Sequence, residues 1–173
     1  MPEAEHRQQF DSAQLAKVSE VFAGYPELPW MLASGSIIRV QKIVARQVTA
    51  VLKGVEDLSM PRYEILGFLD RAEAGRLAVR DLKVASFLHP PSLTYILDWL
   101  EERELVARSG NRADRRSVVI TITDSGRALF QRATKALSQI RFGLEGLDKD
   151  SAMEVAQVLS RVRANPGSDA DAE

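Results

Sequence analysis

The sequence contains no cysteine and only two histidines, and these shortages exclude several kinds of chemistry. Without thiols the chain can form no disulfide, no thiolate nucleophile and no thiol-based redox switch. His6 and His89 lie far apart in the sequence, and no cluster of residues has the spacing of metal ligands. We therefore expect neither a metal site nor a cofactor.

Motifs of catalysis and membrane insertion are missing from the sequence as well. It has no phosphate-binding glycine loop, no HExxH and no GxSxG. A serine hydrolase would need a histidine as its base, but His6 lies near the N-terminus and His89 precedes two prolines. No apolar run reaches the roughly 18 residues that span a bilayer, and no basic-then-apolar leader is present. We expect a cytoplasmic protein that is not an enzyme and does not associate with membranes.

The formal net charge is −1, but charge is unevenly distributed along the chain. Both ends are acidic, whereas the segment from Arg103 to Arg116 holds five arginines and only two acidic residues, Glu104 and Asp114. Such a local surplus of positive charge can meet phosphates even when the whole chain is nearly neutral. The alternative interpretation is an ordinary solvated loop.

The N-terminal third, residues 1–57, is predicted to be helical and to form a dimerisation part. A first helix is expected over residues 4–23, followed by a break at Gly24, Pro26 and Pro29. A second helix is expected from about Ser36 to Lys53, because apolar residues recur there at steps of three and four: Ile37, Val40, Val44, Val48 and Val51. This helix is apolar on more than one face, as expected of a helix packed between two subunits.

Residues 58–123 are predicted to form a winged helix-turn-helix domain. Ser59 is a favourable N-cap for a helix with Pro61 in its first turn, and a short strand at 77–79 and a short helix at 80–87 follow. A further helix is expected from about Pro91 to Arg103, with Leu93, Leu97 and Leu100 facing inward. Two strands, 105–108 and 118–123, enclose the polar, arginine-rich loop and so predict a wing.

The last part of the chain is again expected to be helical. Thr123 or Asp124 would cap a long helix to about Phe142, and Asp148 would cap a final helix, so residues 124–163 complete the dimerisation part. Residues 164–173 are expected to form a flexible tail. The predicted fold is therefore mainly α with a small β-hairpin wing, a winged helix-turn-helix flanked by helical dimerisation elements.

The segment Leu58 to Phe130 resembles the multiple-antibiotic-resistance regulator (MarR) family of bacterial winged-helix proteins. The motif Asn111-Arg112-Ala113-Asp114-Arg115-Arg116-Ser117, a β-branched strand and Ile122-Thr123-Asp124-Ser125-Gly126 follow the family pattern "D-R-R, strand, L-T-x-x-G". Ser92-Leu93-Thr94, Leu97-Asp98 and Leu100-Glu101-Glu102 resemble the family's recognition helix.

The resemblance implies a homodimer that binds double-stranded DNA at a pseudo-palindromic operator. It implies that Arg116 enters the minor groove, that Asp114 shapes the loop, and that Arg112 and Arg115 meet phosphates. On the recognition helix, Ser92 and Thr94 would touch bases or backbone. The complete predicted DNA-binding set is Pro91, Ser92, Thr94, Tyr95, Arg112, Asp114, Arg115 and Arg116.

Two aromatic residues stand where family members often carry arginine or asparagine. Tyr95 could bind a phosphate or contact a thymine methyl group, and Trp99 is expected to pack against the wing or hairpin. Whether each of them contacts DNA or packs internally stays open at this point.

The resemblance also implies an effector, because many relatives release DNA when a small aromatic or acidic ligand binds. The missing cysteine and histidine cluster argue against peroxide and zinc sensing. Candidate ligand-binding residues are Trp30, Arg39, Tyr63 and Glu64, at the junction of the long helix and the winged domain. The alternative is that Trp30 and Tyr63 are core or interface aromatics.

The sequence thus predicts a sequence-specific DNA-binding transcriptional regulator, a repressor released by a small organic ligand. The alternative is a winged-helix protein-interaction module without specific DNA binding. The predicted recognition helix carries no basic residue, and this supports the alternative.

Overall fold

The computed structural model describes residues 13, 16–86, 88–110 and 118–163. The chain divides into two compact units, residues 1–43 and residues 44–173, and each is described by itself. The predicted flexible tail, residues 164–173, lies outside the described residues.

The first unit contains helical backbone at residues 16–21, within the helix predicted for 4–23, and the beginning of helix α2. Helix α2 spans Leu28–Lys53, so the predicted start near Ser36 was wrong by two turns. Pro29 does not prevent this earlier start, since a proline in the first helical turn lacks only an N–H that would have no partner there. Large apolar side chains of α2 in this unit are solvent-exposed, namely those of Trp30, Met31, Ile37, Ile38, Val40 and Ile43.

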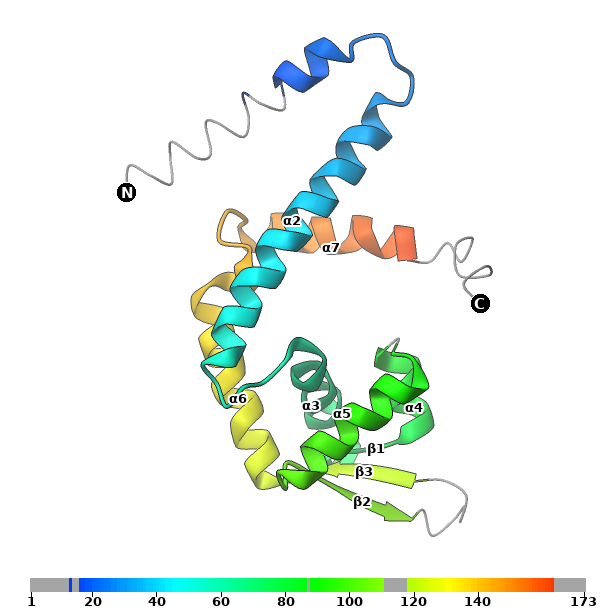
Figure 1. Cartoon of the computed structure of the whole chain (residues 1–173), viewed down its shortest axis with the longest axis vertical. Coiled ribbons are helices and arrows are strands. Elements are labelled where there is room, and N and C mark those ends of the chain that lie inside the picture. The colour runs from blue at the N-terminus through cyan, green and yellow to red at the C-terminus, as the bar shows by residue number, and fades with distance from the viewer. Residues whose placement is uncertain (1–12, 14–15, 87, 111–117, 164–173) are drawn as a thin grey trace. The chain divides into compact units, whose positions relative to one another are not determined.

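The second unit contains the remaining elements, shown in Figure 1. After the last turns of α2, the order is α3 (Met60–Arg71), the 3-10 turn η1 (Glu73–Gly75), β1 (Arg76–Ala78), α4 (Val79–Ser86), α5 (Pro90–Glu102), β2 (Val106–Gly110), β3 (Val118–Ile122), α6 (Asp124–Gln139), the 3-10 turn η2 (Arg141–Gly143) and α7 (Lys149–Arg163). This is the predicted mainly α fold with a small β-hairpin, and the helix-turn-helix is the pair α4 and α5.

The sheet has the strand order β1-β3-β2, and both pairings are antiparallel. In the hairpin Val106 faces Ile122 and Gly110 faces Val118, and the predicted short strand adds a third member, with Leu77 facing Ile120. Ile120 and Ile122 of β3 are buried, as expected for a strand with one face on the core. The sheet therefore anchors the hairpin to the helical body.

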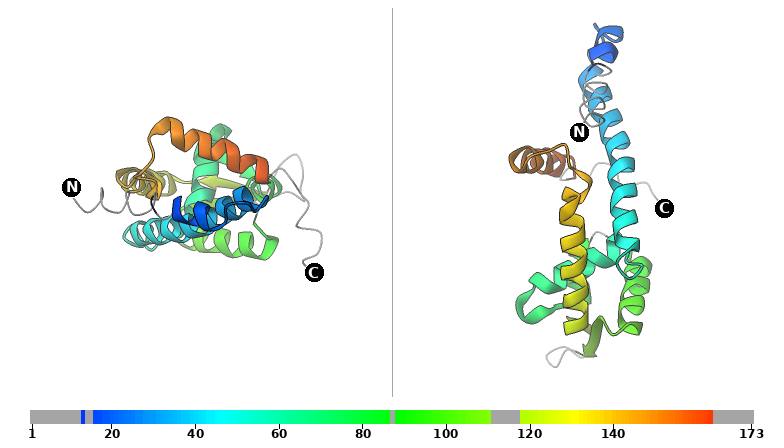
Figure 2. Two further views of the ribbon diagram at one scale, coloured as in Figure 1. Left: turned by 90° about the horizontal axis from the view of Figure 1, so that it is seen from above. Right: turned by 90° about the vertical axis from the view of Figure 1, so that its left-hand side faces the viewer.

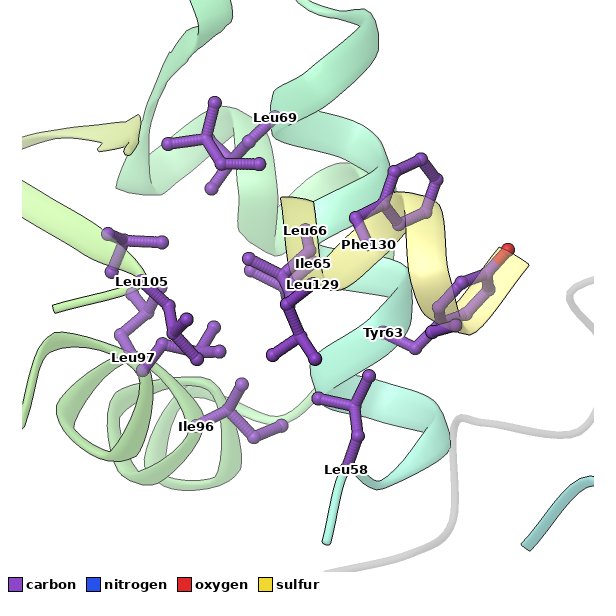
Figure 3. Packing of buried hydrophobic residues seen from close by; sticks show 14 of the residues in the cluster. Leu58, Tyr63, Ile65, Leu66, Leu69, Ile96, Leu97, Leu105, Leu129 and Phe130 are labelled. Carbon is purple, nitrogen blue, oxygen red and sulfur yellow. The ribbon is translucent and has the colours of Figure 1, made fainter. Parts of the chain in front are cut away.

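Residues from α3, α5, α6 and the start of β2 meet in one apolar core, shown in Figure 3. Leu66, Leu97 and Leu129, one from each helix, are almost completely shielded from solvent. The core fixes α5 by its inner face, so the opposite side of that helix is left for other contacts.

Helix α6 runs from the end of β3 to the η2 turn (Figure 2). It ends at Gln139 instead of the predicted Phe142. Arg141, Phe142 and Gly143 have φ angles of 44°, 56° and 81°, a left-handed conformation that cannot continue an α-helix. Asp148 caps α7 as predicted, since its Oδ1 accepts a hydrogen bond of 2.8 Å from the Ser151 N–H.

Within the described ranges, none of the helices combines the length and the apolar character that crossing a membrane requires. The same residues contain no group of three or more His, Asp or Glu side chains that could hold a metal ion.

Candidate nucleic-acid interface

Helix α5 presents an exposed side at its N-terminal end. Its inner face is buried in the core through Leu93, Ile96, Leu97 and Leu100. The four residues of this helix that the sequence predicts to contact DNA are all exposed, namely Pro91, Ser92, Thr94 and Tyr95. The helix can therefore offer this end to a partner without disturbing the core.

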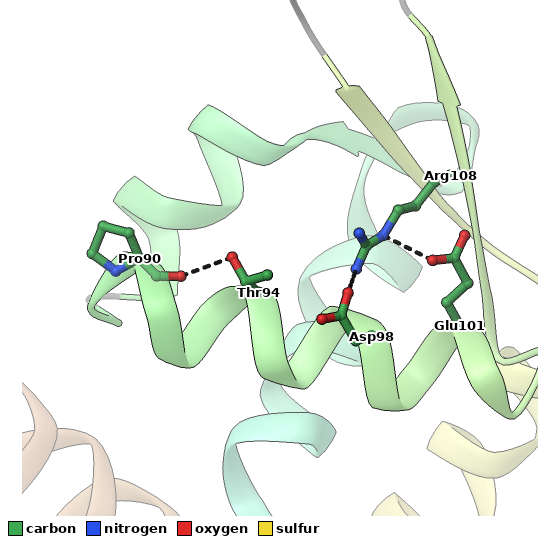
Figure 4. Close-up of polar contacts among 5 residues, drawn as sticks. All are labelled: Pro90, Thr94, Asp98, Glu101 and Arg108. Carbon is green, nitrogen blue, oxygen red and sulfur yellow. Dashed lines mark hydrogen bonds and ion pairs between the residues drawn. The ribbon is translucent and has the colours of Figure 1, made fainter.

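The polar side chains of α5 are partly engaged within the protein, as Figure 4 shows. Thr94 Oγ1 donates a hydrogen bond of 3.1 Å to the Pro90 carbonyl oxygen, so the hydroxyl keeps only its acceptor capacity. Arg108 of β2 pairs with Asp98 and also with Glu101, whose Oε2 lies 3.0 Å from Arg108 Nε. The helix and the first hairpin strand are thereby connected by charge as well as by apolar packing.

The predicted tip of the wing falls between the two hairpin strands. Strand β2 ends at Gly110 and β3 begins at Val118, and the predicted DNA-contacting residues of the wing lie outside the described residues, namely Arg112, Asp114, Arg115 and Arg116. Their predicted roles therefore remain predictions.

Trp99 packs within the protein, against arginines and the core. Its ring lies between the guanidinium groups of Arg62 and Arg103, 3.7 Å and 3.9 Å from the ring centroid, and it borders the apolar core. Such cation–π contacts stabilise both partners when they are partly desolvated. Tyr95, in contrast, is 66% exposed, with the Arg62 guanidinium 5.9 Å from its ring.

A surface groove of about 470 Å³ runs between the first turns of α3 and α5. We call it the α3–α5 groove, and it is lined by Ser59, Pro61, Arg62, Pro91, Ser92, Tyr95 and Ile96. Sequence reasoning missed this groove and with it Arg62, because the two sides are about thirty residues apart in the chain. The available signal was a proline in the first turn of each of the two helices, but the sequence does not show that these two turns lie side by side.

Of the four candidate ligand residues, two lie in the first unit and two in the second. Trp30 is 70% exposed and Arg39 is also exposed, both in the first unit. Tyr63 is buried, its ring stacks on Phe130 at 5.1 Å, and its hydroxyl lies 3.1 Å from Thr134 Oγ1. These contacts agree with the alternative stated for Tyr63, a core aromatic.

The fourth candidate, Glu64, has a shifted pKa. It lies on the exposed side of α3, one residue after Tyr63. Neighbouring protein atoms partly desolvate its carboxylate, which raises the pKa of Glu64 above its ordinary value. Glu64 is not among the residues that line the α3–α5 groove.

Comparison with known proteins places these features among transcriptional regulators. The model of the MarR family matches residues 56–117. The chain is similar to Sco5413, a MarR family transcriptional regulator from Streptomyces coelicolor, with 34% identity and a TM-score of 0.70 over 80% of this chain and 96% of that chain. It is also similar to the uncharacterized HTH-type transcriptional regulator YfiV of Bacillus subtilis, 32% identical over 113 residues, 63% of this chain and 69% of YfiV.

A more distant structure shares the fold. It is that of Bordetella bronchiseptica BpsR, whose DNA binding is regulated by 6-hydroxynicotinic acid. The identity is 22% and the TM-score 0.59, over 74% of this chain and 98% of BpsR.

Proposed function

Because this chain belongs to the MarR family of transcriptional regulators, we propose that it is a homodimeric repressor that binds a pseudo-palindromic DNA operator. The observation that supports this most directly is the exposed N-terminal end of α5, with Pro91, Ser92, Thr94 and Tyr95 outside the core. A helix held in this way can enter the major groove, where its first residues reach base edges. The hairpin that follows α5 would bring Arg116 toward the adjacent minor groove.

The DNA-binding proposal is tested by selecting duplexes from a random pool with the full-length protein. We expect an enriched pseudo-palindrome, since a two-fold dimer presents two helices to half-sites about one DNA turn apart. Absence of any enriched duplex would contradict the proposal and favour a protein-interaction module.

The role of the wing is tested with Arg116→Ala. We expect the substitution to cost about 1–3 kcal/mol of binding free energy for the selected duplex, because a charged groove contact is lost. The dimer and the circular dichroism spectrum should not change. An unchanged affinity would refute the assignment of Arg116.

We further propose that DNA is released when a small aromatic carboxylic acid occupies the α3–α5 groove. Pro61, Pro91 and Ile96 supply apolar walls for a ring. Arg62 supplies a cation, and no carboxylate among the described residues pairs with it. A ligand carboxylate on Arg62 would be a charge-assisted contact.

Competition between ligand and DNA is expected, because the groove shares residues with the predicted DNA-contacting set. Ser92 and Tyr95 line the groove and also belong to the predicted DNA-contacting set. A ligand that holds these side chains would therefore compete with an operator. Regulation of BpsR by 6-hydroxynicotinic acid supports an aromatic acid as the ligand class.

Calorimetry with a panel of aromatic carboxylic acids, 6-hydroxynicotinic acid included, tests the effector proposal. We expect at least one acid to bind the wild-type protein and to weaken DNA binding, and we expect Arg62→Gln to remove acid binding. Arg103→Gln is the matched control, because Arg103 covers the other face of Trp99 but does not line the groove. Equal acid binding by Arg62→Gln and the wild type would exclude this groove.

A further inference from the structure

The negative charge of α5 opposes the approach of this helix to DNA. The helix contains three acidic residues, Asp98, Glu101 and Glu102, and neither lysine nor arginine. Phosphates carry one negative charge per nucleotide, so unpaired carboxylates on this helix would oppose its approach. Something in the protein must offset this charge if the helix is to bind.

Arg108 supplies the offsetting charge from a neighbouring element. Its guanidinium pairs with Asp98 and Glu101 together, so one cation of β2 holds two of the three carboxylates of α5 (Figure 4). The residues Thr94, Asp98 and Glu101 follow one another at steps of four and three, and therefore lie on one side of the helix. Arg108 thus sits on the same side of α5 as a predicted DNA-contacting residue.

Stability does not explain this arrangement well. The side chains of Arg108, Asp98 and Glu101 are 31%, 49% and 42% exposed. Ion pairs with this exposure are screened by water and salt and contribute little to folding. An effect on a charged partner is a better explanation. Charges act on one another over about 10 Å at 0.1 M salt, and Asp98 lies about one helical turn, or about 5.4 Å along the axis, from the predicted DNA-contacting residue Thr94.

We infer that Arg108 is a positioning residue for DNA binding, which acts by neutralising Asp98 and Glu101 so that α5 can approach the phosphates. The inference rests on the proposed DNA-binding function and adds a residue outside the predicted DNA-contacting set. Arg108 acts through the two carboxylates and need not touch DNA itself.

The test measures affinity for a duplex selected by the wild-type protein, at several salt concentrations. We expect Arg108→Gln to weaken binding about ten-fold, because it exposes two like charges to the phosphates. The loss should be largest at the lowest salt concentration, because salt screens the repulsion between the exposed carboxylates and the phosphates. Adding Asp98→Asn and Glu101→Gln to Arg108→Gln should restore affinity to within about two-fold of the wild type, because the exposed charges are then gone.

A matched control separates this effect from a general change in net charge. Glu102 and Glu104 are exposed carboxylates next to the bridge, and neither pairs with Arg108. The triple variant Arg108→Gln, Glu102→Gln, Glu104→Gln has the same formal charge as the first triple variant but should remain weak. Equal rescue by the two triple variants would overturn the inference.

Other outcomes also decide the matter. A salt slope that falls by about one in Arg108→Gln, without rescue by the first triple variant, would identify Arg108 as a phosphate contact and overturn the positioning role. Wild-type affinity in Arg108→Gln would overturn it as well, while leaving the proposed function intact. Failure of the wild-type protein to bind any duplex would refute both.

Thermal unfolding of each variant guards against loss of structure. We expect nearly unchanged melting temperatures, because the bridge is exposed. If Arg108→Gln unfolds, Arg108→Lys provides the test, because lysine keeps the positive charge beside Asp98 and Glu101 and should bind within about two-fold of the wild type. A folded lysine variant about ten-fold weaker than the wild type would contradict neutralisation.

Discussion

Gly126 lies in the first turn of α6, directly against the carbonyl oxygen of Leu105. A Cβ atom at this position would overlap that oxygen and lie 3.0 Å from Ile122 Cγ1. The neighbouring Thr123 fixes the same junction, because its hydroxyl donates to the Glu104 carbonyl oxygen at 2.7 Å and accepts from the Gly126 N–H at 3.0 Å. The glycine of the "L-T-x-x-G" pattern is therefore required by packing between α6 and the start of the hairpin.

We expect Gly126→Ala to lower the free energy of unfolding by about 3 kcal/mol, the upper range for overpacking, because the obstacle is backbone and cannot rotate away. Urea unfolding measures the change. Gly146→Ala is the control, since nothing lies within 4 Å of its added Cβ atom. Similar unfolding of both variants would show that the close approach at Gly126 has no energetic consequence.

At the scale of elements, the start of α7 depends on an ionised cap. The Ser151 N–H, and then its side chain, hydrogen-bond to the Asp148 carboxylate and lower the pKa of Asp148 below its ordinary value of 3.8. The charged form is thus favoured in the folded protein, so its stabilisation is present above pH 3.8 and is lost as the pH falls through the lowered pKa.

We expect amide hydrogen exchange in the first turn of α7 to accelerate below pH 3.8 in the wild type, relative to the intrinsic rate. Asp148→Asn should remove this acceleration, because asparagine caps a helix without titrating. Asp150→Asn, a change in the same turn that leaves the cap intact, should behave as the wild type. Identical pH profiles for the two variants would contradict the role of the cap.

The elements could largely be predicted from the sequence, because periodicity and caps are local signals. The inward residues Leu93, Leu97 and Leu100 were identified in this way. The cap of α6 was predicted at Thr123 or Asp124, and Thr123 is the N-cap. The start of α2 was missed because Pro29 was read as a break, and the end of α6 because positive φ angles at Arg141 and Phe142 have no sequence signal.

The candidate site was less accessible to sequence reasoning. The exposed residues of α5 follow from its inward stripe, but the α3–α5 groove and the Arg108 bridge join segments that only folding brings together. Trp99 shows the same limit for one of its partners, since Arg103 follows it by four residues whereas Arg62 comes from α3.

At the scale of the whole molecule, exposed apolar side chains indicate association. Helix α7 exposes Met153, Val155, Val158, Leu159 and Val162, and the first unit has its own exposed apolar residues on α2. Apolar surface of this extent commonly marks a protein–protein interface, which agrees with the proposed homodimer.

We expect Val158→Asp to shift the protein from dimer to monomer, measured by sedimentation equilibrium. The dimer should be weakened by about 3 kcal/mol, because a two-fold interface loses the buried valine twice. Gln157→Asp, which adds the same charge at the neighbouring polar position, should leave the dimer intact. A dimer of wild-type strength in Val158→Asp would exclude this face of α7 from the interface.

The indole between two guanidinium groups gives the molecule a built-in optical probe. The chain has only two tryptophans, so replacing Trp30 by phenylalanine leaves Trp99 as the sole source of indole emission. An anion that draws Arg62 away from this ring alters the polarity and quenching around it, and the emission changes accordingly. Filling of the groove can thus be followed in solution without attaching a dye, and separately from any measurement on DNA.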